Sequence, residues 1–172
     1  MSAGRRGAHL SEVEAFIGDY QSARDRGRIA FAWNGQHADG FRDANAAFRR
    51  QVVRAVVADV RAAPVELVRD LYDAETSWAK EAWCVNAEAV RTLAEELLTR
   101  GGATFVEDYL AGKVGRGMDA SMSAYFDCPR QLAEQLLAEV EARLAAGAEG
   151  ERKALLDAGR DIFRSWVENS TC

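Results

Sequence analysis

The chain has 172 residues, a formal net charge of −5, 48% apolar residues and 28% charged residues. A chain of this size and composition can bury a core without metals or disulfides, which excludes a disordered protein and a small disulfide-stabilised fold. Because prolines are rare and helix-forming residues are abundant, we expect an all-α single-domain bundle of about seven or eight helices. The domain is predicted to span residues 11–168, with flexible ends at residues 1–10 and 169–172.

The N-terminal part combines a helix with a segment that lacks helical periodicity. Ser11 and Glu14 form a capping box, which predicts the start of the first helix. After this helix, apolar residues alternate with alanines, and Asn34-Gly35 marks a turn. We expect either a short extended segment near residues 28–35 or an apolar loop, because the polar residues after the turn argue against a complete hairpin.

Three longer helices are predicted in the middle of the chain. A valine-rich apolar stripe predicts the first of them over residues 41–62. Pro64 suits the first turn of the next helix, which reaches about Trp83. Asn86 is the expected N-cap of the third helix, which ends at Gly101.

The C-terminal part is predicted to hold further helices that glycine-rich segments separate. Thr104 and Glu107 form a second capping box. A flexible basic loop is expected over residues 112–118, and it lacks the spacing of a phosphate-binding P-loop. Pro129 opens an amphipathic helix, and the last helix carries Gly159 on its apolar face, where it could admit a neighbouring helix.

The apolar stripes of these helices define a predicted core that includes Leu71, Trp78, Leu97 and Leu136. Glu75 falls between two apolar rows of its helix, which favours a buried ion pair or a helix-edge position over a catalytic acid. The acidic series on the other side of this helix is expected to be a solvated face. Its members are Glu66, Asp70, Asp73, Ser77 and Glu81.

Metal sites and catalytic sites have no signature in this sequence. The two histidines, His9 and His37, do not follow a glutamate by three residues, as they do in metal-binding helical bundles. Cys84, Cys128 and Cys172 lack the spacing of zinc ligands and of a disulfide framework. We therefore predict no catalytic residue, no metal ligand and no cofactor, and we expect a protein that is not an enzyme.

The densest group of versatile polar side chains follows an aromatic stretch near the turn. It consists of Trp33, Asn34, His37, Asp39 and Arg42. One hypothesis is a ligand-binding or partner-binding site at the mouth of the helical core. The alternative is a polar surface loop that caps the helix after it.

Arginines of the long predicted helix form a second candidate surface. Arg50, Arg54 and Arg61 share one face of this helix, and a basic helix face can bind nucleic acid. The acidic balance of the whole chain disfavours that function. We expect this arginine face to pair with the acidic face of the next helix instead.

The preferred function is a non-enzymatic helical interaction or regulatory protein that binds another protein. Residues 1–63 carry 10 basic and 7 acidic residues, and residues 64–172 carry 12 and 20, so self-association is a further possibility. Two alternatives stay open. One is a small-molecule-binding or enzymatic bundle that uses residues 31–43, and the other is a nucleic-acid-associated protein that uses Arg50, Arg54 and Arg61.

The expected location is the cytoplasm of a bacterial cell. No stretch approaches the roughly 18 consecutive apolar residues of a membrane helix, so no membrane partner is expected. The first residues lack the apolar region of a secretory signal, and arginine far outnumbers lysine, as in GC-rich bacteria.

Overall fold

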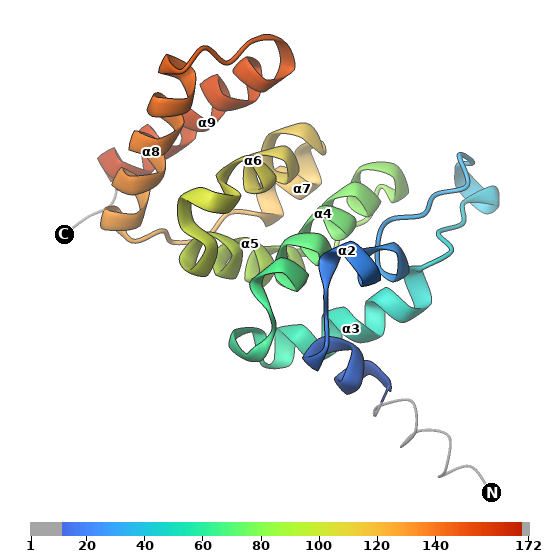
Figure 1. Cartoon of the computed structure of the whole chain (residues 1–172). Helices are drawn as coiled ribbons and strands as arrows, with labels where there is room; N and C mark the ends of the chain where they lie inside the picture. The colour runs from blue at the N-terminus through green and yellow to red at the C-terminus, as the bar shows by residue number, and fades with distance from the viewer. Residues whose placement is uncertain (1–11, 170–172) are drawn as a thin grey trace, which may run out of the picture.

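The structure, a computed structural model, describes residues 12–169. Residues 12–18 form a first helical segment. The other α-helices are α2 (Ser22–Asp25), α3 (Ala46–Ala58), α4 (Val65–Ala82), α5 (Ala87–Gly101), α6 (Val106–Gly115), α7 (Met118–Ser123), α8 (Arg130–Ala145) and α9 (Gly150–Asn169) (Figure 1). The described residues contain no β-strand, so the prediction of an all-α helical bundle is confirmed.

Some predictions fall on parts of the chain outside residues 12–169. These are the capping role of Ser11 and the flexibility expected for residues 1–10 and 170–172. Among the helices that the structure describes, none is both long enough and apolar enough to cross a membrane.

Helix α4 is the central helix of the bundle. It packs against α2 and α3, which precede it, and against α5, α6 and α7, which follow it. Helices α8 and α9 pair with each other at one end of the molecule, where α9 contacts α6, and the loop before α3 projects at the other end (Figure 1). The predicted core residues Leu71, Leu97 and Leu136 have no exposed surface, whereas Trp78 is only partly buried.

The predicted flexible loop at residues 112–118 is wrong in its first half, because α6 continues through Gly115. Gly112 is needed for packing: a Cβ atom at this position would lie 2.5 Å from the Tyr72 ring. This ring cannot easily move, since it is fully buried and its hydroxyl donates a hydrogen bond to the Tyr109 carbonyl at 3.0 Å. Lys113 is also buried, and its ammonium group donates to the carbonyl of Ser121.

Gly159 fulfils its predicted role as a point of close helix contact. It is buried in α9, and a Cβ atom there would lie 2.4 Å from a methyl carbon of Leu110 in α6. The small residue therefore lets the α8–α9 pair approach the central helices.

Helix starts follow local capping where distant residues do not interfere. Asn86 caps α5 as predicted, since its side chain accepts a hydrogen bond from the Ala89 amide at 3.3 Å. The long helix, however, begins at Ala46 and not near residue 41. The Asp43 carboxylate accepts hydrogen bonds from the Ala32 and Asn45 amides, both at 3.1 Å, which keeps this stretch in the loop.

The second predicted capping box is wrong. Residues Gly102–Phe105 form a 3-10 turn, and α6 begins only at Val106. The Glu107 carboxylate bonds Arg143 at 2.6 Å and Arg152 at 2.8 Å, so it joins α6 to α8 and α9 instead of capping its own helix.

The predicted solvated acidic face of α4 is also wrong at its centre, where Asp70 is 1% exposed. The Asp70 carboxylate accepts hydrogen bonds from the Tyr20 hydroxyl and the Ser22 hydroxyl, both at 2.6 Å. Arg69 donates to the same carboxylate at 2.7 Å. The segment around α2 covers this face, and it supplies polar partners that make burial of the charge possible.

Candidate functional site

The loop before α3 is closed at its base by a minimal antiparallel bridge between Trp33 and Asp43. The Asn34 amide donates to the Arg42 carbonyl at 3.0 Å, and the Ala44 amide donates to the Ala32 carbonyl at 3.1 Å. The expected extended segment near residues 28–35 is thus reduced to one bridge, with no strand on either side.

Two predicted site residues hold this loop together from within. The Asn34 side chain donates to the Gly40 carbonyl at 2.8 Å and accepts from the Arg42 amide at 3.0 Å. The Trp33 indole donates to the Gln36 carbonyl at 2.9 Å, and the centre of its ring lies 4.8 Å from the centre of the His37 ring. Asn34 and Trp33 therefore use their polar groups for hydrogen bonds that shape the loop.

A buried ionic cluster ties the base of the loop to the bundle. Arg49 in α3 contacts the Asp43 carboxylate at 2.5 Å and the Glu75 carboxylate of α4 at 2.8 Å. The side chains of Arg49 and Asp43 are 1% exposed, and that of Glu75 is 7% exposed. Of the two positions predicted for Glu75, a buried ion pair or a helix edge, the structure shows the buried ion pair. Its partner had a signal in the sequence: a basic residue in register with the valine stripe of α3.

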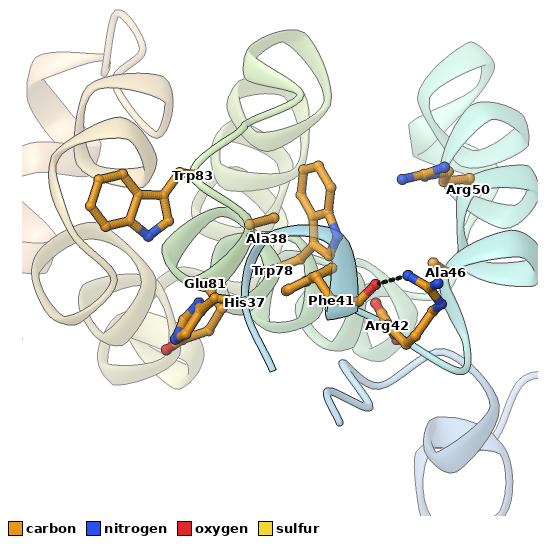
Figure 2. A pocket seen from close by; sticks show the side chains of 11 residues that line it. His37, Ala38, Phe41, Arg42, Ala46, Arg50, Trp78, Glu81 and Trp83 are labelled. Carbon is orange, nitrogen blue, oxygen red and sulfur yellow. Dashed lines mark hydrogen bonds between the residues drawn. The ribbon is translucent and has the colours of Figure 1, made fainter. Parts of the chain in front are cut away.

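A cleft of about 700 Å³ opens between this loop, the start of α3 and the end of α4. We call it the tryptophan cleft, and it is lined by His37, Ala38, Phe41, Arg42, Asp43, Ala46, Arg50, Trp78, Glu81, Ala82 and Trp83 (Figure 2). The structure thus brings the predicted site residues His37 and Arg42 to one cavity. Trp33, Asn34 and Asp39 do not line it.

Sequence reasoning missed the two tryptophans of the cleft, since it assigned both to the apolar rows of α4. Trp83 is 84% exposed, and it ends the helix in a left-handed conformation with φ 53° and ψ 35°. Figure 2 shows Trp78 between Trp83 on one side and Arg50 on the other. The Arg50 guanidinium carbon lies 5.6 Å from the centre of the Trp78 ring, within the range of a cation–π contact.

Backbone strain gathers at this cleft. In the described residues, only Ala38 (φ 52°) and Trp83 (φ 53°) combine a side chain with a positive φ angle, and both line the cleft. A side chain in this conformation costs about 1–2 kcal/mol, and helices commonly place glycine there. Such strain is typical of functional sites, because folding alone would select against it.

The predicted pairing of the arginine face with the acidic face of α4 is wrong. Arg50, Arg54 and Arg61 form no ion pair with any carboxylate in the described part of the chain. The acidic face is occupied by other residues: Arg26 and Arg116 pair with Asp73, each at 2.9 Å. The arginine face is left open as a result.

A second hollow of about 470 Å³ adjoins the tryptophan cleft and shares Arg50 and Trp78 with it. Its other lining residues are Arg49, Arg54, Glu75, Cys84, Val85 and Asn86. The two hollows thus lie side by side at the end of α4, with Arg50 and Trp78 common to both.

The lining of the cleft is chemically mixed. It contains aromatic and charged side chains but no serine, threonine, cysteine or lysine that could act as a nucleophile. Residues 12–169 contain no group of histidine, cysteine and carboxylate side chains placed to hold a metal ion.

Three groups elsewhere in the bundle have clearly shifted pKa values. Hydrogen bonds from Arg152 and Arg143 lower the pKa of Glu107 to about 2, and burial raises the pKa of Cys128 to about 11. Burial also lowers the pKa of Lys113. Each shift is explained by packing or pairing within the bundle, so none of them points to a catalytic acid or base.

Comparisons with known proteins found no match to a protein family, to a curated protein or to a solved structure. The chemistry of the cleft is therefore the guide to function.

Proposed function

We propose that this chain is a non-enzymatic interaction protein that binds a segment of another protein in the tryptophan cleft. The observation that carries the proposal is Trp83, which is 84% exposed in a strained backbone conformation at the edge of the cleft. Large aromatic side chains are enriched at protein interfaces and supply much of the binding energy there.

The energetics of Trp83 support a partner. A tryptophan offers about 150–250 Å² of surface, and covering it contributes roughly 4–6 kcal/mol before the costs of association. The free chain leaves this stabilisation unused, although a glycine at the same position would relieve the backbone strain. A binding partner that covers the indole explains why a tryptophan stands there.

The shape of the site favours a polypeptide over a small molecule. Small-molecule pockets bury most of the ligand surface, whereas a wall formed by an 84% exposed side chain encloses little. The adjoining hollow extends the site past Trp78 and Arg50, so an extended or helical segment can contact both parts. The cleft therefore suits a protein partner better than the alternative function of a small-molecule-binding or enzymatic bundle.

Affinity selection from a displayed library of random peptides tests the proposal. The full chain serves as bait, and the affinities of selected peptides are then measured by fluorescence anisotropy. We expect Trp83→Gly to weaken binding at least about tenfold, as for a central interface aromatic.

Tyr125→Ala is the matched control, because Tyr125 is also exposed but lines a different hollow beside Trp166. Its affinities should stay within about twofold of the wild-type values, as for a residue outside the interface. Selected peptides that bind Trp83→Gly as tightly as the wild-type chain would overturn the proposal.

A further inference from the structure

Most arginines in the described part of the chain bond a carboxylate within it, and five do not. The five are Arg42, Arg50, Arg54, Arg61 and Arg91. Arg42 and Arg50 line the tryptophan cleft, and Arg54 lines the hollow beside it. Three of these five arginines therefore lie at the proposed binding site, although acidic residues outnumber basic ones in the whole chain.

The guanidinium groups of the cleft have free donors. One nitrogen of Arg42 donates to the Asp39 and Phe41 carbonyls, at 3.0 and 2.8 Å, which holds the side chain in place and leaves its other nitrogens available. The Arg50 side chain lies over the Trp78 ring and forms no hydrogen bond within the described residues. A carboxylate can accept two parallel hydrogen bonds from a guanidinium group, which makes it a well-matched ligand.

The acidic side chains of the cleft do not cancel this charge. Asp43 is already bonded to Arg49. Of the acidic residues that line the cleft, Glu81 is thus the one left to offset the positive charges of Arg42 and Arg50. In Figure 2, Glu81 lies with Trp83 on one side of Trp78, and both arginines lie on the other side. The cleft thus has one end with Trp83 and Glu81 and a basic end at Arg42 and Arg50.

We infer that the partner segment is acidic, with carboxylates next to a large apolar side chain that covers Trp83. This inference rests on the proposed function and adds the chemistry of the partner. Nucleic acid fits less well, because a phosphate backbone needs a longer basic surface than the few arginines of the cleft provide. The charge of distant parts of the chain affects a bound peptide little, since screening is strong beyond roughly 8 Å at physiological salt.

Parallel peptide selections test the inference. Three baits are used: the wild-type chain, Arg42→Gln/Arg50→Gln, and Arg61→Gln/Arg91→Gln as a control that removes unpaired arginines elsewhere. The library displays random peptides of about 12 residues, which reach roughly 40 Å when extended. Wild-type and control baits should select peptides rich in Asp and Glu beside Trp, Phe or Leu, and the Arg42→Gln/Arg50→Gln bait should lose the acidic preference.

The tightest selected peptide is then compared with a twin in which Asn and Gln replace Asp and Glu. We expect the twin to bind the wild-type chain at least about tenfold more weakly. Both peptides should bind Arg42→Gln/Arg50→Gln with similar affinity. Equal affinity of the twins for the wild-type chain would overturn the inference.

The outcomes separate this inference from the proposed function. Peptides that depend on Trp83 but not on their acidic residues would overturn the inference and keep the proposed function. If no peptide depends on Trp83, both are wrong. A single-stranded oligonucleotide that competes more strongly than the acidic peptide would replace a protein partner with nucleic acid. Self-association that Arg42→Gln/Arg50→Gln abolishes would replace it with a second copy of the chain.

Discussion

The two ends of α4 differ in whether the side chains around them find partners within the bundle. Near its start, Asp70 is buried and accepts hydrogen bonds from Tyr20, Ser22 and Arg69. Near its end, Trp83 is exposed, and the arginine beside Trp78 has no carboxylate partner in the described chain. Side chains that find partners within the bundle explain the fold, whereas those that find none indicate where another molecule can bind.

The sharpest form of this contrast lies in two consecutive arginines. Arg49 is buried between Asp43 and Glu75, and Arg50 points into the cleft. Arg49→Leu leaves two carboxylates buried without a counter-charge, so we expect the free energy of unfolding to fall by about 3–5 kcal/mol. Urea denaturation measures this loss.

Arg50→Leu is the matched control for this prediction. It removes a side chain whose contact within the bundle is the cation–π contact with Trp78, so the free energy of unfolding should change by less than about 1 kcal/mol. Similar values for the two variants would contradict the division of α3 into a structural face and an open face.

A substitution at Gly112 tests how tightly α6 packs against α4. Gly112→Ala places a methyl group against the Tyr72 ring, which a hydrogen bond to the Tyr109 carbonyl holds in position. We expect a loss of about 1–3 kcal/mol, as for an overpacked core, measured by urea denaturation.

Gly159→Ala is the comparison, because its methyl group would meet the terminal methyl groups of Leu110, which no hydrogen bond holds in place. The loss there should be smaller, since the leucine can change its rotamer. The gain of about 1 kcal/mol from replacing a helical glycine with alanine applies at both positions. A Gly112→Ala variant that is as stable as the wild-type chain would mean that α6 can shift away from α4.

The parts of the fold that depend on local sequence could be predicted. Helical periodicity identified the long helices, and Asn86 marked the start of α5 because its cap is formed by residues next to it in the chain. The burial of Asp70 could not be predicted, since its partners Tyr20 and Ser22 lie about fifty residues earlier in the sequence. Gly112 was assigned to a loop because the sequence does not show that Tyr72 packs against it.

The candidate site was predicted in part for the same reason. The local density of polar residues pointed to His37 and Arg42, and both line the cleft. Trp78 and Trp83 continue the apolar rows of α4, so periodicity assigned them to the core. Periodicity does not show where a helix extends past its neighbours, and the end of α4 is such a place.

Glu107 provides a pH-dependent test of the ion pairs that join α6 to α8 and α9. Its pKa is lowered to about 2, first by Arg152 and also by Arg143, from about 4.3 in the unfolded chain. A carboxylate with a lowered pKa stabilises the fold above the unfolded value, and this contribution is lost as the pH falls from about 5 towards 2.

We therefore expect Glu107→Gln to cost about 1 kcal/mol at neutral pH and almost nothing near pH 2. Urea denaturation across this pH range measures both values. A constant difference between variant and wild-type chain would show that the ion pairs with Arg143 and Arg152 contribute nothing.

The central claim is that Trp83 serves binding and not folding. The most direct test is the free energy of unfolding of Trp83→Gly, measured by urea denaturation with and without a selected peptide. Glycine relieves about 1–2 kcal/mol of backbone strain and loses about 0.4–1 kcal/mol to the entropy of the unfolded chain. Without peptide, the variant should be as stable as the wild-type chain or up to about 1.5 kcal/mol more stable.

At a peptide concentration of about 100 times the dissociation constant, the wild-type chain should gain about 2.7 kcal/mol. The variant should gain much less at the same concentration, because it has lost the indole that the peptide covers. A variant that loses more than about 1 kcal/mol without peptide, outside the range expected for an exposed residue, would contradict the claim, as would one that gains the full wild-type stabilisation with it.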